Sequence, residues 1–527
     1  MDELTKIALV GTSRHAGVVP LDDAISALFS EVAADREEQT LLQAGVKSIY
    51  AMAGRRPAAD ISAVEPAPPE AAKTATRKLA GLLQNALAAR ANDLLIDFLR
   101  QMQASHIIVP ADLLPEMLAC NDAEVRRQLL PVLGERGLWL SRQNPDWSWV
   151  EKGVSHLTAA DQHELKRVWD EGSIAERGAA LALFRRTNPA AARDWLAQVF
   201  SREKPNNRAS LLEKLETGLS ADDESFLDAC LADRSSSVVQ VAARLLCRLP
   251  KSALAGRMRT RGDAMLSGEQ KGFLRKKPRL VCAPPEKIDR DWERDGIPAR
   301  APAGKGLRAF WAETTLAAIP PAHWQEHLSL APAALIEAIE EDNFEAAVLA
   351  GWTEAAIRFA ACDVASAEWL VPLWRHWSGA AERMKGRGRA EALERLKGLL
   401  PAMNREQAEQ SLIELFETAQ KTDDVESLAL VPMAPRPWSA DFSRQFLAII
   451  RQVLKKRSDN AAYQWAGALF SVARAIPAEV FPSALAPWEI PEAGASAAWH
   501  VNAIQREIDQ FIETVQTRQS FLEEISK

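Results

Sequence analysis

The clearest hydrophobic pattern of the chain lies between Arg208 and Leu254. Three short segments follow one another there, each with apolar residues three and four positions apart. They are Leu211, Leu212, Leu215 and Leu219; Phe226, Leu227, Cys230 and Leu231; and Val238, Val241, Ala242, Leu245 and Leu249. This spacing places the apolar side chains on one face of a helix. Helices this short are marginally stable alone, so we expect three amphipathic helices packed against their neighbours.

The same pattern recurs elsewhere in degenerate form. Residues 113–133 resemble residues 226–246, and residues 173–186 carry a weaker copy. In the first two copies, Asp122 and Asp233 precede the second helix, where each is expected to accept hydrogen bonds from backbone amides. Such repeats predict stacked helical pairs with a period of about 40 residues, as in HEAT repeats. The predicted fold is therefore all-α, an irregular HEAT-like helical-repeat solenoid.

Proline-rich joints divide the chain. We expect an N-terminal helical segment (residues 1–56), a HEAT-like helical array (71–277), a Pro-rich internal connector (278–306) and a C-terminal helical region (307–527). The prolines of the connector exclude regular helix there. Trp292 and Trp311 are expected to attach the connector to the array. Strand signals are close to absent, so the chain is expected to be mostly or wholly helical.

The last predicted helix runs from about 495 to 525 and carries a regular apolar seam. Its members are Val501, Ile504, Ile508, Phe511 and Val515. Three-and-four spacing of this kind is typical of a coiled-coil seam. The helix can cap the final repeats with this seam, and the alternative is contact with a second copy or another partner.

Composition narrows the function classes. The chain has 47% hydrophobic and 26% charged residues with a net charge of -7, as in an ordinary globular protein, and no polyanion partner is implied by overall charge. The five cysteines are scattered singly, which fits a reducing compartment and buried free thiols. Sixteen tryptophans against two tyrosines suggest large apolar wedges between helices. The N-terminus does not resemble a signal peptide, so a cytoplasmic protein is expected.

Several segments together resemble a bacterial family, a domain of unknown function with a HEAT-like fold. They are LTKIALVGTSR (4–14), LLQAGVKSIYAMAGRRP (41–57), the blocks 208–258 and 290–311, and IDQFIETVQTRQSFLEEI (508–525). The resemblance implies a gene neighbourhood with a MoxR-type AAA+ ATPase, a von Willebrand A-domain protein and a SWIM zinc-finger protein. It implies no catalytic residue and no cofactor. We therefore expect a non-enzymatic scaffold or adaptor that binds partner proteins such as these.

The strongest local charge asymmetry lies near the end of the array. Its basic residues include Arg257, Arg259, Arg261, Arg275, Lys276 and Lys277. A helical-repeat surface lined by such residues can bind a polyanion or an acidic partner. The alternative function is thus nucleic-acid binding at residues 257–279. The acidic segment 286–295 can equally fold back and neutralise this cluster.

A second motif with chemical meaning is His323-Trp324-Gln325-Glu326-His327, which matches the H-x-x-E-H pattern of zinc hydrolases. Histidines at i and i+4 share a helical face and can ligate one zinc ion. Pro320 and Pro321 place His323 at or before the first turn. A third ligand is needed, and Glu337, Glu340 and Glu341 are the downstream candidates. A solvated first turn is the favoured interpretation, so no metal ligand is predicted here, and a zinc hydrolase centred on His323 and His327 is the less favoured alternative function.

Gly11-Thr12-Ser13-Arg14 resembles a phosphate loop only superficially, because the Gly-x-x-x-x-Gly-Lys frame is missing. We expect a helix to end at Gly11 instead.

Overall fold

The computed structural model describes residues 3–14, 35–53, 65–151, 153, 162–271, 277–339, 342–491 and 498–527. The described parts are mostly helical, as predicted. Contacts divide the chain into two units, residues 1–67 and 68–527. The predicted divisions inside the second unit stay predictions.

The described residues of the first unit include the helices α1 (Glu3–Val10) and α3 (Arg36–Ala53). The hydroxyl of Thr12 donates to Glu37 Oε1 at 2.9 Å. Gly11 has a φ of +89° and its amide donates to the carbonyl of Ile7 at 2.8 Å. A left-handed glycine in this position ends a helix. The prediction that α1 ends at Gly11 is confirmed.

The second unit begins with a helical segment whose hydrophobic core is separate from that of the later helices and contains residues from Ala75 to Val150 together with Phe521 of the last helix. Its short strands β1 (Lys73–Thr74) and β2 (Ile107–Ile108) pair in parallel. Asp122 Oδ1 accepts from the amides of Glu124 and Val125 at 3.0 and 2.9 Å, as predicted. The helices of this segment are α4 (Arg77–Ala88), α5 (Asn92–Ala104), α6 (Leu114–Leu118), α7 (Ala123–Leu129) and α8 (Gly134–Ser141).

The next helices include those with the clearest sequence pattern. Leu211, Leu215 and Val238 are fully buried, and Asp233 accepts from the amide of Ser235 at 2.8 Å just before the third predicted helix. The three helices predicted between 208 and 254 are confirmed as α13 to α15. The bounds are α10 (Gln162–Glu171), α11 (Ile174–Thr187), α12 (Pro189–Phe200), α13 (Pro205–Glu213), α14 (Glu224–Cys230), α15 (Ser236–Cys247) and α16 (Ala253–Met265).

A buried ion pair joins α11 to the turn before α14. Arg185 is fully buried and forms two hydrogen bonds with Asp223, at 2.9 and 2.8 Å. Its guanidinium also donates to the backbone carbonyls of Thr217, Pro189, Leu215 and Gly218, at 2.7 to 3.1 Å. Asp223 in turn accepts from the amide of Ser220 at 3.1 Å, as part of a capping box at this turn. The group of charges is fully hydrogen-bonded, as buried charges require.

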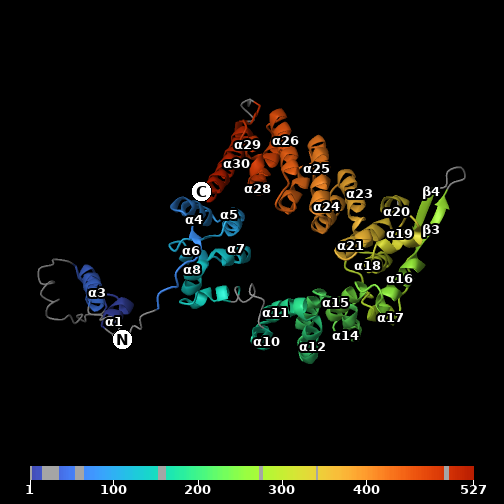
Figure 1. The fold of residues 1–527 in the computed structure, drawn as a ribbon, viewed down its shortest axis with the longest axis horizontal. Helices are drawn as coiled ribbons and strands as arrows, with labels where there is room; N and C mark the ends of the chain where they lie inside the picture. Colours follow the sequence, from blue (N-terminus) through green and yellow to red (C-terminus); the bar gives the residue numbers. More distant parts are fainter. Residues whose placement is uncertain are drawn as a thin grey trace. The chain divides into compact units, whose positions relative to one another are not determined.

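The structure departs from the expectation of almost no strand at a second place besides the short β1–β2 pair. β3 (Leu266–Lys271) and β4 (Lys277–Cys282) form an antiparallel hairpin directly after α16 (Figure 1). Leu266, Leu280 and Cys282 are buried, whereas Arg279 and Val281, which alternate with the last two along β4, are partly exposed. This alternation is too short to stand out from helical periodicity in the sequence, and Pro278 argues against a strand.

The connector is partly ordered by contacts with the array. It contains one short helix, α17 (Arg290–Arg294), and Ile297 is 1% exposed. The indole of Trp311 donates to the carbonyl of Pro298 at 3.1 Å, and the guanidinium of Arg261 lies 4.8 Å from the ring centroid of Trp292. Both tryptophans therefore attach the connector, as predicted.

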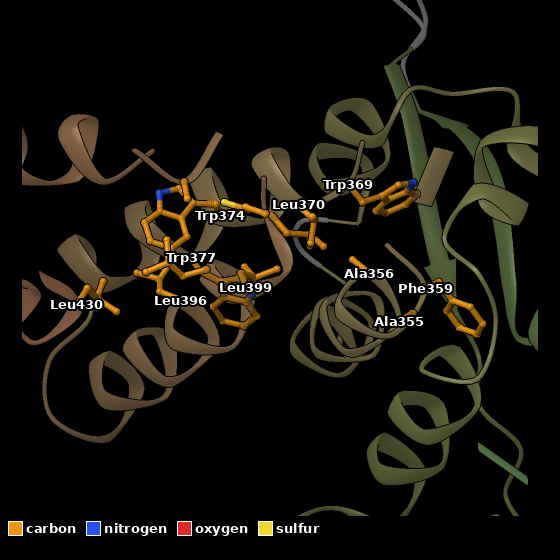
Figure 2. Packing of buried hydrophobic residues seen from close by; sticks show 14 of the residues in the cluster. Ala355, Ala356, Phe359, Trp369, Leu370, Trp374, Trp377, Leu396, Leu399 and Leu430 are labelled. Carbon is orange, nitrogen blue, oxygen red and sulfur yellow. The ribbon is translucent and has the colours of Figure 1, made fainter. Parts of the chain in front are cut away.

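Tryptophans fill the spaces between the helices that follow. The rings of Trp352 and Trp369 meet edge to face at 5.0 Å, and Figure 2 shows Trp369, Trp374 and Trp377 along the core. The prediction that tryptophans act as apolar wedges is confirmed. The helices are α18 (Leu307–Leu316), α19 (Ala322–Leu328), α20 (Pro332–Ala338), α21 (Glu345–Phe359), α22 (Val364–Ala367), α23 (Leu370–Arg383), α24 (Arg387–Leu399), α25 (Arg405–Thr422), α26 (Ala440–Lys456), α27 (Asn460–Gly467), α28 (Leu469–Ala475), α29 (Phe481–Ala484) and α30 (Ala498–Ile525).

The last helix, α30, packs against both ends of the second unit. Its predicted seam lies against α27 and α28, and Ile504, Ile508 and Val515 are at most 1% exposed. Most of the seam is therefore covered within the chain, as expected for a helix that caps the final repeats. Further along, α30 lies beside α4 and α5 (Figure 1), where the rings of Phe98 and Phe521 stack at 3.9 Å.

Candidate functional site

The structure brings together three potential metal ligands from two helices. Asp263 lies near the end of α16, and His323 and His327 lie on α19. Asp263 Oδ1 is 2.6 Å from His323 Nε2 and 3.8 Å from His327 Nε2. One ligand atom from each residue lies within 4.8 Å of those of the other two. The two imidazole rings are nearly parallel, with an interplanar angle of 15° and centroids 5.5 Å apart.

The third potential ligand, Asp263, is not one of the three glutamates that the sequence offered as candidates. Glu337 is exposed on α20 and does not belong to the group, while Glu340 and Glu341 lie outside the described residues. Asp263 precedes His323 by 60 positions. The spacing of the two histidines was informative, but no local pattern in the sequence points to Asp263.

A glycine allows the two helices to approach. A Cβ atom added at Gly262 would lie 2.4 Å from Ile319 Cδ1 and 3.0 Å from Trp324 Cη2. Trp324 is fully buried, so its ring fills the space beside Gly262 and fixes the rotation of α19. His323 and His327 flank this tryptophan on the same helix. The packing of Trp324 on Gly262 therefore holds the imidazoles near Asp263.

We expect Gly262→Ala to destabilise the protein, because the added methyl group meets two apolar side chains in a packed core. Overpacking of this kind costs about 1–3 kcal/mol. Urea unfolding followed by tryptophan fluorescence measures the effect. Gly256→Ala on the same helix is the matched control, since nothing lies within 4 Å of its Cβ position. Equal stability of the two variants would contradict the proposed close approach.

The basic cluster is partly neutralised by the segment that follows it. Arg257 donates to both carboxylate oxygens of Asp295, at 2.8 and 2.6 Å, and Arg261 lies 2.7 Å from the same carboxylate. Asp295 is 2% exposed. Its hydrogen bond raises the pKa of Arg257 above the ordinary value. The expectation that segment 286–295 folds back on this cluster is confirmed at Asp295.

The structure does not describe a surface that joins the other basic candidates to Arg257 and Arg261. Arg259 is half-buried and donates to the carbonyl of Pro250 at 3.1 Å. The backbone of Lys277 belongs to β4. Arg275 and Lys276 lie outside the described residues. Nucleic-acid binding at residues 257–279 stays a prediction.

A groove of about 600 Å³ lies between four helices of the second unit, α13, α15, α18 and α21. Small apolar side chains contribute to its lining, among them Val241, Ala243, Ala317 and Ala318. The connector residues from Asp295 to Pro298 also line it. The backbone of the connector lies close to α15 here, because a Cβ atom added at Gly296 would lie 2.6 Å from the Cβ atom of Ala243.

Charges of both signs line the same groove. Glu213 pairs with Arg244 at 3.1 Å, and Glu354 pairs with Arg395 at 3.1 Å. Arg358 donates to the carbonyl of Ala317 at 2.8 Å, and burial lowers its pKa below the ordinary value. The groove was not identified from the sequence, since its lining comes from residues up to about 150 positions apart.

Among the described helices, none combines the length and the apolar character that a membrane span requires. A search of curated proteins returns no match. One matching solved structure is the crystal structure of an engineered protein, 12% identical, with 86% of this chain and 100% of that chain covered and a TM-score of 0.24. A likeness at that score supports no argument about fold or function. Residues 3–525 match the family of unknown function DUF5691, and the chain belongs to this family.

Proposed function

We propose that the protein is a non-catalytic scaffold, a HEAT-like helical-repeat protein whose groove binds an extended segment of a partner protein. The observation that carries the proposal is the groove between α13, α15, α18 and α21. Four separate helices each contribute residues to it, and surfaces shared by several helices are how helical repeats build binding sites.

The lining of the groove favours a peptide over a polyanion. The small side chains of Ala243, Ala317 and Ala318 allow the backbone of a bound segment to approach closely. Glu213 and Glu354 would repel phosphates, whereas a peptide with charges of both signs can pair with these acids and with Arg244.

The partner class comes from the family resemblance described above. A MoxR-type AAA+ ATPase, a von Willebrand A-domain protein and a SWIM zinc-finger protein are the partners we propose to test first. In such an assembly the scaffold would hold partner proteins next to the ATPase. Cytoplasmic location belongs to the same proposal, because a cytosolic ATPase would need its scaffold there.

The test is a pulldown from the native host with quantitative mass spectrometry, comparing the wild type with Glu354→Arg. Glu354 lines the groove and its side chain is 47% exposed, so the reversed charge changes the surface without burying a charge. We expect the recovery of the specific partner to fall at least about tenfold, because like charges placed opposite each other cost several kcal/mol.

Glu391→Arg is the matched control. Glu391 also lies near Arg395, at 3.8 Å, but it does not line the groove. Its variant loses the same type of ion pair and should keep the partner. Equal recovery with wild type, Glu354→Arg and Glu391→Arg would reject the groove as the binding surface.

A further inference from the structure

We propose that Asp263, His323 and His327 form a binding site for one divalent transition-metal ion of the zinc class. The site lies apart from the groove, and the proposal is independent of the scaffold function. It rests on the chemistry of the three side chains and on how closely the fold brings them together.

The distances are close to those that a metal ion requires. Two ligand atoms on a tetrahedral zinc ion, each at about 2.0–2.1 Å, lie about 3.3 Å apart. The measured distances from Asp263 Oδ1 to the two Nε2 atoms, 2.6 and 3.8 Å, lie on either side of this value. Small side-chain rotations would bring the carboxylate and both imidazoles to ligand distance.

The set of ligands selects the class of ion. Imidazole nitrogens favour zinc, cobalt, nickel and iron, whereas magnesium and calcium prefer an all-oxygen shell. Three protein ligands leave room for water, and the three side chains are accessible to it. Their exposed fractions are 32% for Asp263, 18% for His323 and 39% for His327.

The bound ion would connect two separate parts of the second unit. Asp263 is two residues before the end of α16, and α19 follows only after the β3–β4 hairpin, the connector and α18. A metal ion that ligates both helices would therefore add a cross-link between the array and the helices after the connector. A ligand that binds only the folded protein also stabilises it by mass action.

The competing interpretation is a hydrogen bond between His323 and Asp263 without a metal ion. His327 distinguishes the two. At 3.8 Å from Asp263 it lies beyond hydrogen-bond distance, so a purely structural pair does not need it. A metal site does need it, because removal of His327 leaves two ligands.

The experiment measures binding of Zn²⁺ to the full chain by calorimetry, and of Co²⁺ by its ligand-field absorption. All proteins carry Cys362→Ser, because this exposed thiol is itself a potential zinc ligand. We expect one ion per chain in this background. His327→Ala and Asp263→Asn should each lower the affinity at least about tenfold, as expected for the loss of one of three ligands.

Stability without added metal shows whether a variant is folded. His327→Ala should unfold at the same temperature as the parent protein when a chelator is present, and only the parent should be stabilised by Zn²⁺. His106→Ala is the matched control, since His106 is exposed on a turn distant in sequence from the cluster. The absence of stoichiometric binding, or equal binding by His327→Ala and the parent, would overturn the proposal.

Discussion

Replacement of Arg185 by methionine is expected to lower the free energy of unfolding by about 3–5 kcal/mol, the typical cost of breaking a buried ion pair. Arg185 is fully buried, and Asp223 is 1% exposed. Without the guanidinium, the carboxylate of Asp223 loses its bidentate partner inside the protein and keeps the longer ion pair with Arg193, at 3.4 Å. A buried carboxylate that has lost its main partner is the costly species, rather than the loss of the pair itself.

The backbone adds to this effect. Four carbonyl groups, those of Thr217, Pro189, Leu215 and Gly218, accept hydrogen bonds from Arg185. Methionine fills a similar volume but donates none of these hydrogen bonds. The turn between α13 and α14 would lose these hydrogen bonds to α11, and the packing of that turn against α11 would be weakened.

Urea unfolding measured by circular dichroism tests this prediction, with Arg186→Met as the matched control. Arg186 is the next residue of the same helix and is exposed, so its replacement should change stability by less than about 0.5 kcal/mol. A similar small loss for both variants would show that Arg185 is not a central contact.

The second large effect is expected from Phe521→Ala on α30. A Phe-to-Ala change in a packed core costs about 3–5 kcal/mol. Phe521 is fully buried and stacks on Phe98 of α5 with an interplanar angle of 5°. Among the buried apolar residues of α30, it belongs to the core of α4 to α8, whereas Ile504, Ile508, Phe511 and Val515 belong to the other core.

The effect should be local. Arg518 supports the same junction, since its Nε donates to Asp97 at 3.0 Å and its guanidinium also donates to the carbonyls of Ala473 and Ile476. We therefore expect faster amide hydrogen exchange in α4 and α5 of Phe521→Ala than in α21 to α25, measured by mass spectrometry.

Arg506→Ala on the same helix is the control for this experiment. Arg506 is exposed, and within the described part of the chain its side chain donates to the carbonyl of Asn502 in its own helix. Its variant should exchange like the wild type. Uniform faster exchange throughout the second unit in Phe521→Ala would show that the two cores unfold together and would contradict the local attachment.

The sequence predicts the helices well because the residues that indicate a helix lie within that helix or next to it. Leu211, Leu215 and Val238 lie at helical spacing, and Asp122 caps a helix only a few residues away. The local periodicity of apolar residues indicates which face of a helix is buried. It does not indicate which other helix covers that face.

For this reason the long-range features are absent from the sequence-based predictions. Arg185 and Asp223 are 38 positions apart, and Asp263 and His323 are 60 positions apart. The sequence does not indicate that Gly262 is a site of close helix packing, because a single glycine within a helical pattern looks the same whether or not another helix lies against it. The spacing in the sequence thus predicts the two histidines among the candidate metal ligands. The aspartate is identified only from the fold.

The contact between α5 and α30 has a consequence for biosynthesis. Asp97 and Arg518 are separated by 421 positions. At a translation rate of about 5–20 residues per second, α5 leaves the ribosome roughly 20–80 s before its partner helix is made. During that interval Phe521 is missing from the core around Phe98, so the first helices of this unit expose apolar surface that a ribosome-associated chaperone can bind.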